Sequence, residues 1–255
     1  MISAAAEAAE QEIKLPPFLP VLPLKDTVVF PQSMAPLVIG QERSIKLIDE
    51  VLSGNRLLAL VAVRDPKVEQ PGFADLYEVG TAALVHRMLR MPDGTLRVLV
   101  QGLQRVKVGP PIREHPYLVG EITELPDVVR ESKELEALVR TVQSTFSRLV
   151  ELVPYLPEEL RVAVANVDDP SVLSYLVAST VRLATEEKQK LLELVDVEER
   201  LRETARLLTR ELEVVELGTK IQSQVASEME KTQREYFLRQ QLRAIQRELG
   251  ELDAE

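Results

Sequence analysis

The chain has 255 residues, which gives room for one or two domains and excludes a large multi-domain enzyme. Hydrophobic residues make up 45% and charged residues 28% of the sequence, as in globular proteins, so most of the chain is expected to fold around a core. The net charge of −10 disfavours a nucleic acid partner, and the absence of Cys excludes disulfides, thiolate ligands and a Cys nucleophile.

The N-terminal segment, MISAAAEAAEQEIK, has neither a basic start nor an apolar core, so it lacks the pattern of a secretory signal. No uninterrupted apolar run reaches the ~18 residues that a membrane span requires. We therefore expect a soluble, cytoplasmic protein that has no membrane partner.

The first half of the chain has the pattern of a β-rich domain. Most of the 16 Pro and 10 Gly of the whole chain lie at or before Pro126, where they break apolar runs at short intervals. Pro-Asp-Gly within Met91–Leu96 predicts a hairpin turn, because Gly94 adopts a positive φ without steric cost. Five apolar runs predict strands: Val28–Pro31, Arg56–Val63, Gly80–Leu89, Leu96–Leu103 and Tyr117–Leu125.

One helix is expected between these strands. Apolar residues recur at helical spacing between Gln41 and Leu52, and Gly54 follows as a stop signal. Together these elements predict a compact lobe of about six strands and one helix, folded as a small, partly closed barrel or a sandwich.

After Pro126 the apolar spacing becomes helical. One stripe runs from Leu135 to Val153, and a second helix is predicted over 158–167. Asp169 followed by Pro170 is typical of an N-cap that opens a third helix. The expected fold class is therefore α+β, with a mostly antiparallel β domain followed by a helical bundle and a long C-terminal helix.

The last element is predicted to be long. Asp196 and Glu199 have capping-box spacing and open a helical pattern that continues to Glu255. If this helix is continuous to Leu249, it is on the order of 80 Å long, so we expect it to meet another chain or domain. The stretch 218–233 is polar and separates two coiled-coil segments that are out of register. These segments are Leu201–Val215 and Leu238–Leu252.

A search for catalytic motifs identifies none. A P-loop is excluded because no Gly-Lys pair exists, and no G-x-S-x-G elbow positions a Ser nucleophile. His86 and His115, without any Cys, do not make up the three or four ligands of a zinc site. We therefore expect no metal and no cofactor in this chain.

Three arginines, Arg239, Arg243 and Arg247, recur every four residues and line one face of the last helix. This face could dock on an acidic protein surface or on nucleic acid. The alternative is a solvated face balanced by acidic residues upstream, which we favour, with nucleic acid ranked last because only 4% of residues are aromatic.

Several segments resemble the N-terminal region of ATP-dependent Lon proteases. Leu19–Ser44 is similar to the family's opening pattern: a Pro-rich strand, a Lys-Asp pair, a V-x-x-P turn and a Gly before the Ser of the first helix. Tyr77–Val108 is similar to its central hairpin. EEKQKLLELVDVEERLRETARLLTRELEVVEL and QREYFLRQQLRAIQRELGE resemble its helical part, the second being specific to the segment before the ATPase module. The resemblance extends from Leu19 to Glu251.

The resemblance implies a barrel-like β lobe, a helical bundle and a long helix that leads into a hexameric AAA+ ring fused to a Ser-Lys peptidase. Those modules would follow Glu251, so the chain is expected to be a non-catalytic fragment of an ATP-dependent serine endopeptidase. ATP and Mg would belong to the parent protein. The expected division is a flexible extension (1–17), the β-rich domain (18–126), the helical bundle (127–195) and the long helix (196–255).

The resemblance further implies that this region captures unfolded or damaged proteins, supports hexamer assembly and delivers substrates to the ring. Such capture requires exposed apolar surface. Alternation along Leu96–Val100 places Leu99 on the polar side of a strand, and irregular Pro-rich segments add further apolar groups. For each residue taken singly, ordinary core packing is the alternative. The candidate substrate-binding residues are Pro23, Leu24, Met34, Pro36 and Leu99.

The competing hypothesis is a structural spacer or oligomerisation module, in which the long helix pairs subunits or contacts the AAA+ module. A nucleic-acid-binding region is the third alternative. The candidate assembly and docking residues are Leu201, Leu208, Leu212, Val215, Leu238, Leu242, Ile245, Leu249, Arg239, Arg243 and Arg247.

Overall fold

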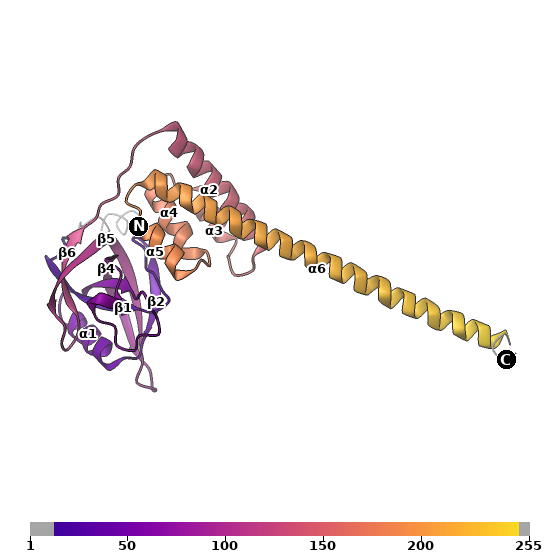
Figure 1. Cartoon of the computed structure of the whole chain (residues 1–255), viewed down its shortest axis with the longest axis horizontal. Helices are drawn as coiled ribbons and strands as arrows, with labels where there is room; N and C mark the ends of the chain where they lie inside the picture. The colour runs from indigo at the N-terminus through magenta and orange to yellow at the C-terminus, as the bar shows by residue number, and fades with distance from the viewer. Residues whose placement is uncertain (1–12, 250–255) are drawn as a thin grey trace, which may run out of the picture.

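The computed structural model describes residues 13–249, which form a β lobe, a helical lobe packed against it and one long helix. Figure 1 shows the β lobe at one end of the molecule and the long helix projecting far beyond both lobes at the other. The α+β class expected from the sequence is confirmed. Predictions for residues 1–12, and for the helix and apolar segment beyond Leu249, lie outside the described residues.

Six strands form one sheet in the order β2-β5-β4-β3-β1-β6, and β6 pairs again with the second half of β5, which closes the sheet into a small barrel. β1 and β3 run parallel, and the other neighbours are antiparallel. β2 pairs only with the first half of β5 and therefore flanks the barrel as an edge strand. The strands are β1 (Phe18–Leu24), β2 (Met34–Ile39), β3 (Leu57–Ala62), β4 (Val79–Arg90), β5 (Leu96–Arg113) and β6 (Val119–Glu124).

The local predictions for this lobe are confirmed where a turn or helix signal supported them. The Pro-Asp-Gly segment connects β4 to β5, and Gly94 has a φ of 86°. The helix expected between Gln41 and Leu52 is α1 (Glu42–Ser53), which covers one open end of the barrel with Leu47 and Ile48. A short 3-10 helix, η2 (Phe73–Asp75), lies in the loop before β4.

The strand predicted at Val28–Pro31 is wrong. This segment is a loop pressed between the two lobes, where Phe30 is fully buried against Tyr175, with ring centroids 6.2 Å apart. Thr81 donates a hydrogen bond to the Val29 carbonyl over 2.6 Å. Gly102 lies so close that a Cβ there would stand 2.1 Å from the Phe30 carbonyl oxygen. The apolar run therefore serves packing between the lobes and not strand pairing.

The expected flexible extension, 1–17, reaches into the described residues. Leu15 packs against a core cluster of the barrel that includes Leu19 and Val106. The Pro17 carbonyl accepts a hydrogen bond from the Ile122 amide over 2.8 Å. The packed part of the β lobe therefore begins before Phe18.

Five helices make up the second lobe. The predicted N-caps are confirmed, since Asp169 accepts from the Ser171 and Val172 amides and Asp196 accepts from the Glu198 and Glu199 amides. One helix more than predicted, α5, follows α4 after a short turn. The helices are α2 (Lys133–Leu152), α3 (Glu159–Ala165), α4 (Pro170–Thr180), α5 (Thr185–Glu193) and α6 (Val197–Glu248). With 52 residues, α6 is about 78 Å long.

A buried ionic network joins the two lobes. Asp127, in the connection after β6, lies between Arg105 of β5 and Arg200 of α6, with both guanidiniums 2.8 Å from its carboxylate oxygens. Each arginine side chain is only 1% exposed. Tyr175 of α4 donates to the same carboxylate over 2.8 Å, and Arg105 also donates to the Leu192 carbonyl over 3.2 Å. Asp127 thus links the barrel directly to α4 and α6, and Arg105 adds a contact to α5. We call Arg105, Asp127, Tyr175 and Arg200 the interlobe network.

Burial of Asp127 opposes its ionisation, but hydrogen bonds and charge from Arg200, with Tyr175 and Arg105, outweigh burial and hold the pKa of the carboxyl below its usual value. Burial is also the main reason that the pKa of Tyr175 is raised to about 12. At neutral pH the network therefore contains an ionised carboxylate and a neutral phenol.

We expect Asp127→Asn to destabilise the fold by roughly 3–5 kcal/mol, because it leaves two buried guanidiniums without a counter-charge. Urea unfolding followed by circular dichroism measures this change. The matched control is Asp49→Asn, which removes the exposed partner of Arg90 and should cost less than about 1 kcal/mol. Equal losses in the two variants would contradict a central role for the network.

The stabilising effect of Asp127 should also depend on pH. Because its pKa is lower in the folded than in the unfolded state, its contribution is complete above the unfolded pKa near 3.8 and is lost as pH falls through the folded value. The difference in unfolding free energy between the wild type and Asp127→Asn should therefore be constant between about pH 5 and 7 and shrink below about pH 4. A difference that stays constant down to about pH 2 would contradict this.

Candidate functional site

The outer face of β2 carries apolar side chains. Met34, Pro36 and Val38 alternate with residues buried in the barrel and point outward. Pro36 lies opposite Leu99 of β5, so these two predicted residues are cross-strand neighbours. β2 accommodates a proline because it lies at the edge of the sheet.

The same face continues onto β4. Leu99 lies opposite Arg87. Two pairs further along, Leu89 lies opposite Arg97, which faces Val38 on its other side. Cross-strand partners share a face, so the apolar groups form one surface with two arginines among them. We call this surface the outer patch; it consists of Met34, Pro36, Val38, Leu89 and Leu99.

The outer patch is open to solvent. Val38 is 72% exposed, Leu89 61% and Met34 52%, whereas Leu99 is half-buried. Large apolar side chains exposed together on a rigid sheet are typical of an interaction surface. The patch therefore has the chemistry to bind apolar segments of another protein.

The other two predicted residues line a groove beside the edge of β2. Pro23 and Leu24, at the end of β1, face Pro36 and Val38 across a hollow of about 420 Å³. Leu24 is only 7% exposed and belongs to the barrel core, so its prediction as a freely exposed contact is wrong. Both faces of β1 are largely covered, since Leu22 and Leu24 pack in one core cluster and Leu19 and Val21 in another.

Sequence reasoning missed Val38 and Leu89. The alternation of Met34, Pro36 and Val38 could have placed Val38 on the outer face. The strand was not predicted, because a proline at its centre argues against a strand. Leu89 is placed by the register of β4 against β5, which includes an irregularity between Val85 and Arg87. A bulge of this kind reverses which residues point outward, so simple alternation from the start of β4 fails.

The first predicted coiled-coil segment of the long helix packs within the chain's own helical lobe. Leu201 and Leu208 are fully buried in the helical-lobe core, and Leu212 and Val215 pack against it. Their prediction as residues that contact another chain is therefore wrong for the two buried positions. Helical periodicity identifies a covered face without identifying what covers it.

A different apolar face of α6 is exposed. The stretch described as polar at the sequence level includes Ile221, Val225 and Met229, which continue from Val214 and Leu217 at helical spacing. At about 100° per residue these positions share a face. We call Val214, Leu217, Ile221, Val225 and Met229 the helix stripe.

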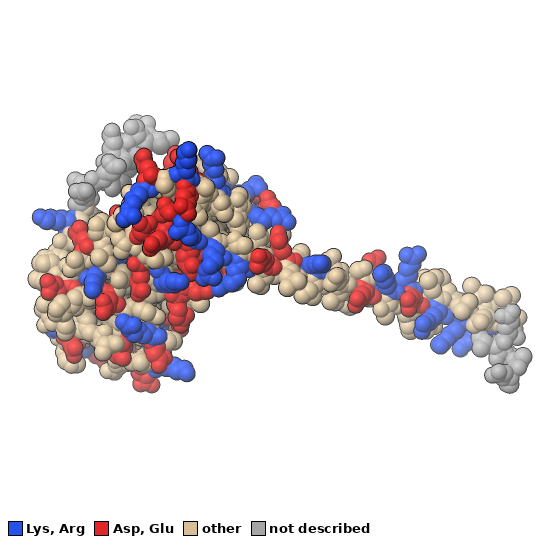
Figure 2. Space-filling view, turned by 45° about the horizontal axis from the view of Figure 1, so that its top comes forward, with Lys and Arg blue, Asp and Glu red and all other residues tan. Residues whose placement is uncertain are grey.

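The second predicted segment is exposed along its described length. Leu238, Leu242, Ile245 and Leu249 are each more than half exposed and lie roughly 120° around the helix from the helix stripe. Arg239, Arg243 and Arg247 are also exposed and continue the line of the helix stripe. Figure 2 shows basic side chains gathered near this end of the helix.

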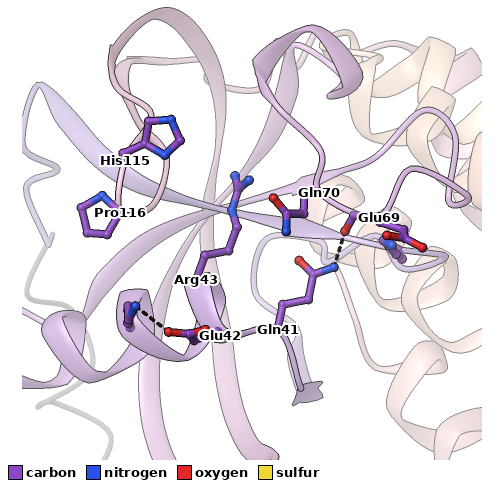
Figure 3. Close-up of a pocket in the computed structure, with 9 residues that line it drawn as sticks. Gln41, Glu42, Arg43, Glu69, Gln70, His115 and Pro116 are labelled. Atoms are coloured by element: carbon purple, nitrogen blue, oxygen red, sulfur yellow. Dashed lines mark hydrogen bonds and ion pairs between the residues drawn. The ribbon is translucent and has the colours of Figure 1, made fainter.

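A polar pocket lies at the start of α1 (Figure 3). It has a volume of about 540 Å³ and contains His115, Lys25 and Arg43 together with acidic side chains. Its groups bind one another: Lys46 pairs with Glu42 at 2.7 Å, and Arg43 donates to the Pro71 carbonyl over 3.0 Å. The other histidine considered as a ligand, His86, is outside this pocket and hydrogen-bonds Gln101 over 2.6 Å.

Residues 13–249 contain no group of three or more His, Asp or Glu side chains placed to hold a metal ion. In the same part of the chain, none of the helices combines the length and the hydropathy required to cross a membrane.

Comparison with known proteins gives consistent results. Residues 18–210 match the family described as ATP-dependent protease La (LON) substrate-binding domain. The chain is 44% identical over 239 residues to a Lon protease of Dictyoglomus thermophilum and 42% identical over 247 residues to Lon protease 1 of Herpetosiphon aurantiacus. These alignments cover 94% and 95% of this chain but only 30% of each relative.

Two solved structures share the fold. The N-terminal domain of a Mycobacterium avium complex Lon protease has a TM-score of 0.63 at 24% identity, covering 75% of this chain and 98% of that one. The Lon N-terminal domain protein from Xanthomonas campestris has a TM-score of 0.53 at 19% identity, covering 75% and 97%. From the family match and the sequence identity to its relatives, this chain belongs to the Lon substrate-binding domain family and corresponds to the N-terminal part of a Lon protease.

Proposed function

We propose that this chain binds unfolded or damaged proteins through the outer patch, as the non-catalytic N-terminal part of an ATP-dependent serine protease. The observation that carries the proposal is the group of exposed apolar side chains on β2, β4 and β5. Unfolded chains differ from folded ones chiefly in their exposed apolar side chains, which such a surface can remove from water. Arg87 and Arg97 add charge that favours segments with acidic residues.

In this proposal the long helix carries bound substrates toward catalytic modules in the parent protein. α6 extends far beyond the helical lobe (Figure 1), and the relatives are about three times as long as this chain. ATP and Mg would act in those modules, since the sequence holds no P-loop. We also propose a cytoplasmic location, since the sequence has no Cys and therefore no sign of an oxidising compartment.

The combined variant Met34→Ser, Val38→Ser and Leu89→Ser should bind an unfolded protein at least about tenfold more weakly. Burial of apolar groups contributes roughly 0.8 kcal/mol for each CH₂, and these exposed side chains contribute little to the core. Fluorescence anisotropy with reduced, carboxymethylated lactalbumin measures the loss, and native lactalbumin tests selectivity for the unfolded form.

Val162→Ser provides the control, because Val162 is 58% exposed on α3, outside the outer patch. It should leave binding unchanged. Wild-type affinity in the triple variant, with unchanged thermal unfolding, would contradict substrate capture by the outer patch.

A second candidate function is assembly through the long helix, which the exposed helix stripe favours. The helical lobe is too small to cover the exposed face of so long a helix. We therefore expect a second copy of the chain to pack against it. Removing the whole helix would not test this, because Arg200 at its start links the two lobes and Leu201 lies in the core of the helical lobe.

Leu217→Ser, Ile221→Ser and Val225→Ser should convert a self-associating wild type into a monomer, as measured by sedimentation equilibrium. Thr219→Ser, Glu230→Ser and Gln241→Ser change exposed positions on the opposite face of the helix and should leave the mass unchanged. A wild type that stays monomeric at tens of micromolar, or a stripe variant with wild-type mass, would exclude this role for the stripe.

A further inference from the structure

The edge of β2 that faces away from β5 presents unpaired backbone groups. The Gly102 amide donates to the Ser33 carbonyl over 2.9 Å, so Ser33 points toward β5. Backbone direction alternates along a strand, which directs the amide and carbonyl groups of Met34, Pro36 and Val38 to the open edge. Pro36 has no N–H, so this edge offers three carbonyls and two amides.

This edge runs along two neighbouring grooves. The groove of about 420 Å³ borders its C-terminal half and is walled by Pro23 and Leu24. A second groove, of about 310 Å³, borders its N-terminal half at Ser33 and Met34. Thr27 and Pro36 line both grooves, so the hollows follow the strand as one channel. The channel is therefore a place where an extended segment can pair with β2.

A cation stands at one end of the channel. Lys188 of α5 lines the second groove together with Thr185 and Ser179. Within residues 13–249 Lys188 has no ion pair, whereas Lys190 on the same helix pairs with Glu203 at 3.1 Å. Lys188 is half-buried, and burial lowers its pKa. An unpaired, partly desolvated ammonium favours an anionic ligand. Asp26 also lines this groove but forms no ion pair with Lys188.

The position of Lys188 distinguishes the two directions in which a strand can be added. In an antiparallel addition, the C-terminus of the added segment lies beside Met34, at the end that Lys188 borders. In a parallel addition, a terminal ammonium would lie there and be repelled. Lys25 lines the other groove, but it is exposed, so water competes for its charge more strongly than at the half-buried Lys188. The charge at Lys188 therefore favours an antiparallel segment with a carboxylate at its end.

We propose that the open edge of β2 binds the C-terminal segment of an unfolded protein as an added antiparallel strand, with its terminal carboxylate at Lys188. Backbone pairing makes such binding tolerant of sequence, and alternate side chains would lie against Pro23 or along the outer patch. β2 has six residues, so the segment is about 20 Å long. This inference rests on the proposed function but names a different contact, a chain end at the strand edge.

The test uses a fluorescein-labelled seven-residue peptide of alternating Val and Thr, with either a free C-terminal carboxylate or a C-terminal amide. The wild type should bind the acid at least about tenfold more tightly than the amide. Lys188→Gln should abolish this difference, and the matched control Lys190→Gln should retain it. Methylating alternate peptide amides should weaken binding of the acid, because the carbonyls at the edge of β2 then receive no hydrogen bonds from the peptide.

Equal affinity for acid and amide, a preference that survives Lys188→Gln, or no binding of either peptide would each overturn the inference. Binding of carboxymethylated lactalbumin is measured alongside. If Lys188→Gln keeps that binding and the peptide preference is absent, the strand-edge inference fails while substrate capture by the outer patch stands. Loss of lactalbumin binding only in the outer-patch variant would separate the two sites.

Discussion

The arrangement of the whole molecule depends on one carboxylate held between two buried arginines. Asp127 follows the last strand of the barrel, Arg105 projects from its longest strand, and Arg200 lies in the first turn of α6. Breaking such a pair leaves an uncompensated charge in the interior, so the lobes have one strongly preferred relative position. That position matters for the proposed binding, because the channel along β2 belongs to both lobes. β2 supplies the strand edge, and α5 supplies Lys188.

The elements that sequence analysis predicted correctly are those with local causes. The hairpin at Gly94 and the caps at Asp169 and Asp196 depend on residues within a few positions of one another. β1 and β2 were not predicted from apolar runs, because prolines interrupt them and their pairing partners lie far away in the chain. The prediction of a strand at Val28–Pro31 failed for the opposite reason. A short apolar run is compatible with a strand or a packed loop, and the contact with the helical lobe decides between them.

The candidate site could be predicted in part. Met34, Pro36 and Leu99 are exposed or half-exposed as expected, and the sheet brings them together on one face. Val38 and Leu89 required the register, and Leu24 required knowledge that both faces of β1 are largely covered. The long helix illustrates the same limit, because the spacing of Leu201 and Leu208 marked a covered face that the bundle itself covers. Lys188 carried no sequence signal at all, since its position beside β2 arises from the interlobe network.

An open strand edge usually invites self-association, and β2 combines an open edge with features that restrict pairing. Pro36 removes the central amide, which shortens the ladder that any added strand can form. Lys188 at one end favours a segment that ends in a carboxylate over the interior strand of a second copy. Pairing limited in this way is weak and reversible. Under the proposed function, in which the domain passes substrates onward, this property is required, because a bound segment must leave as readily as it arrives. Pro36, which prevented the prediction of β2 from the sequence, thus also limits which segments can pair with its edge.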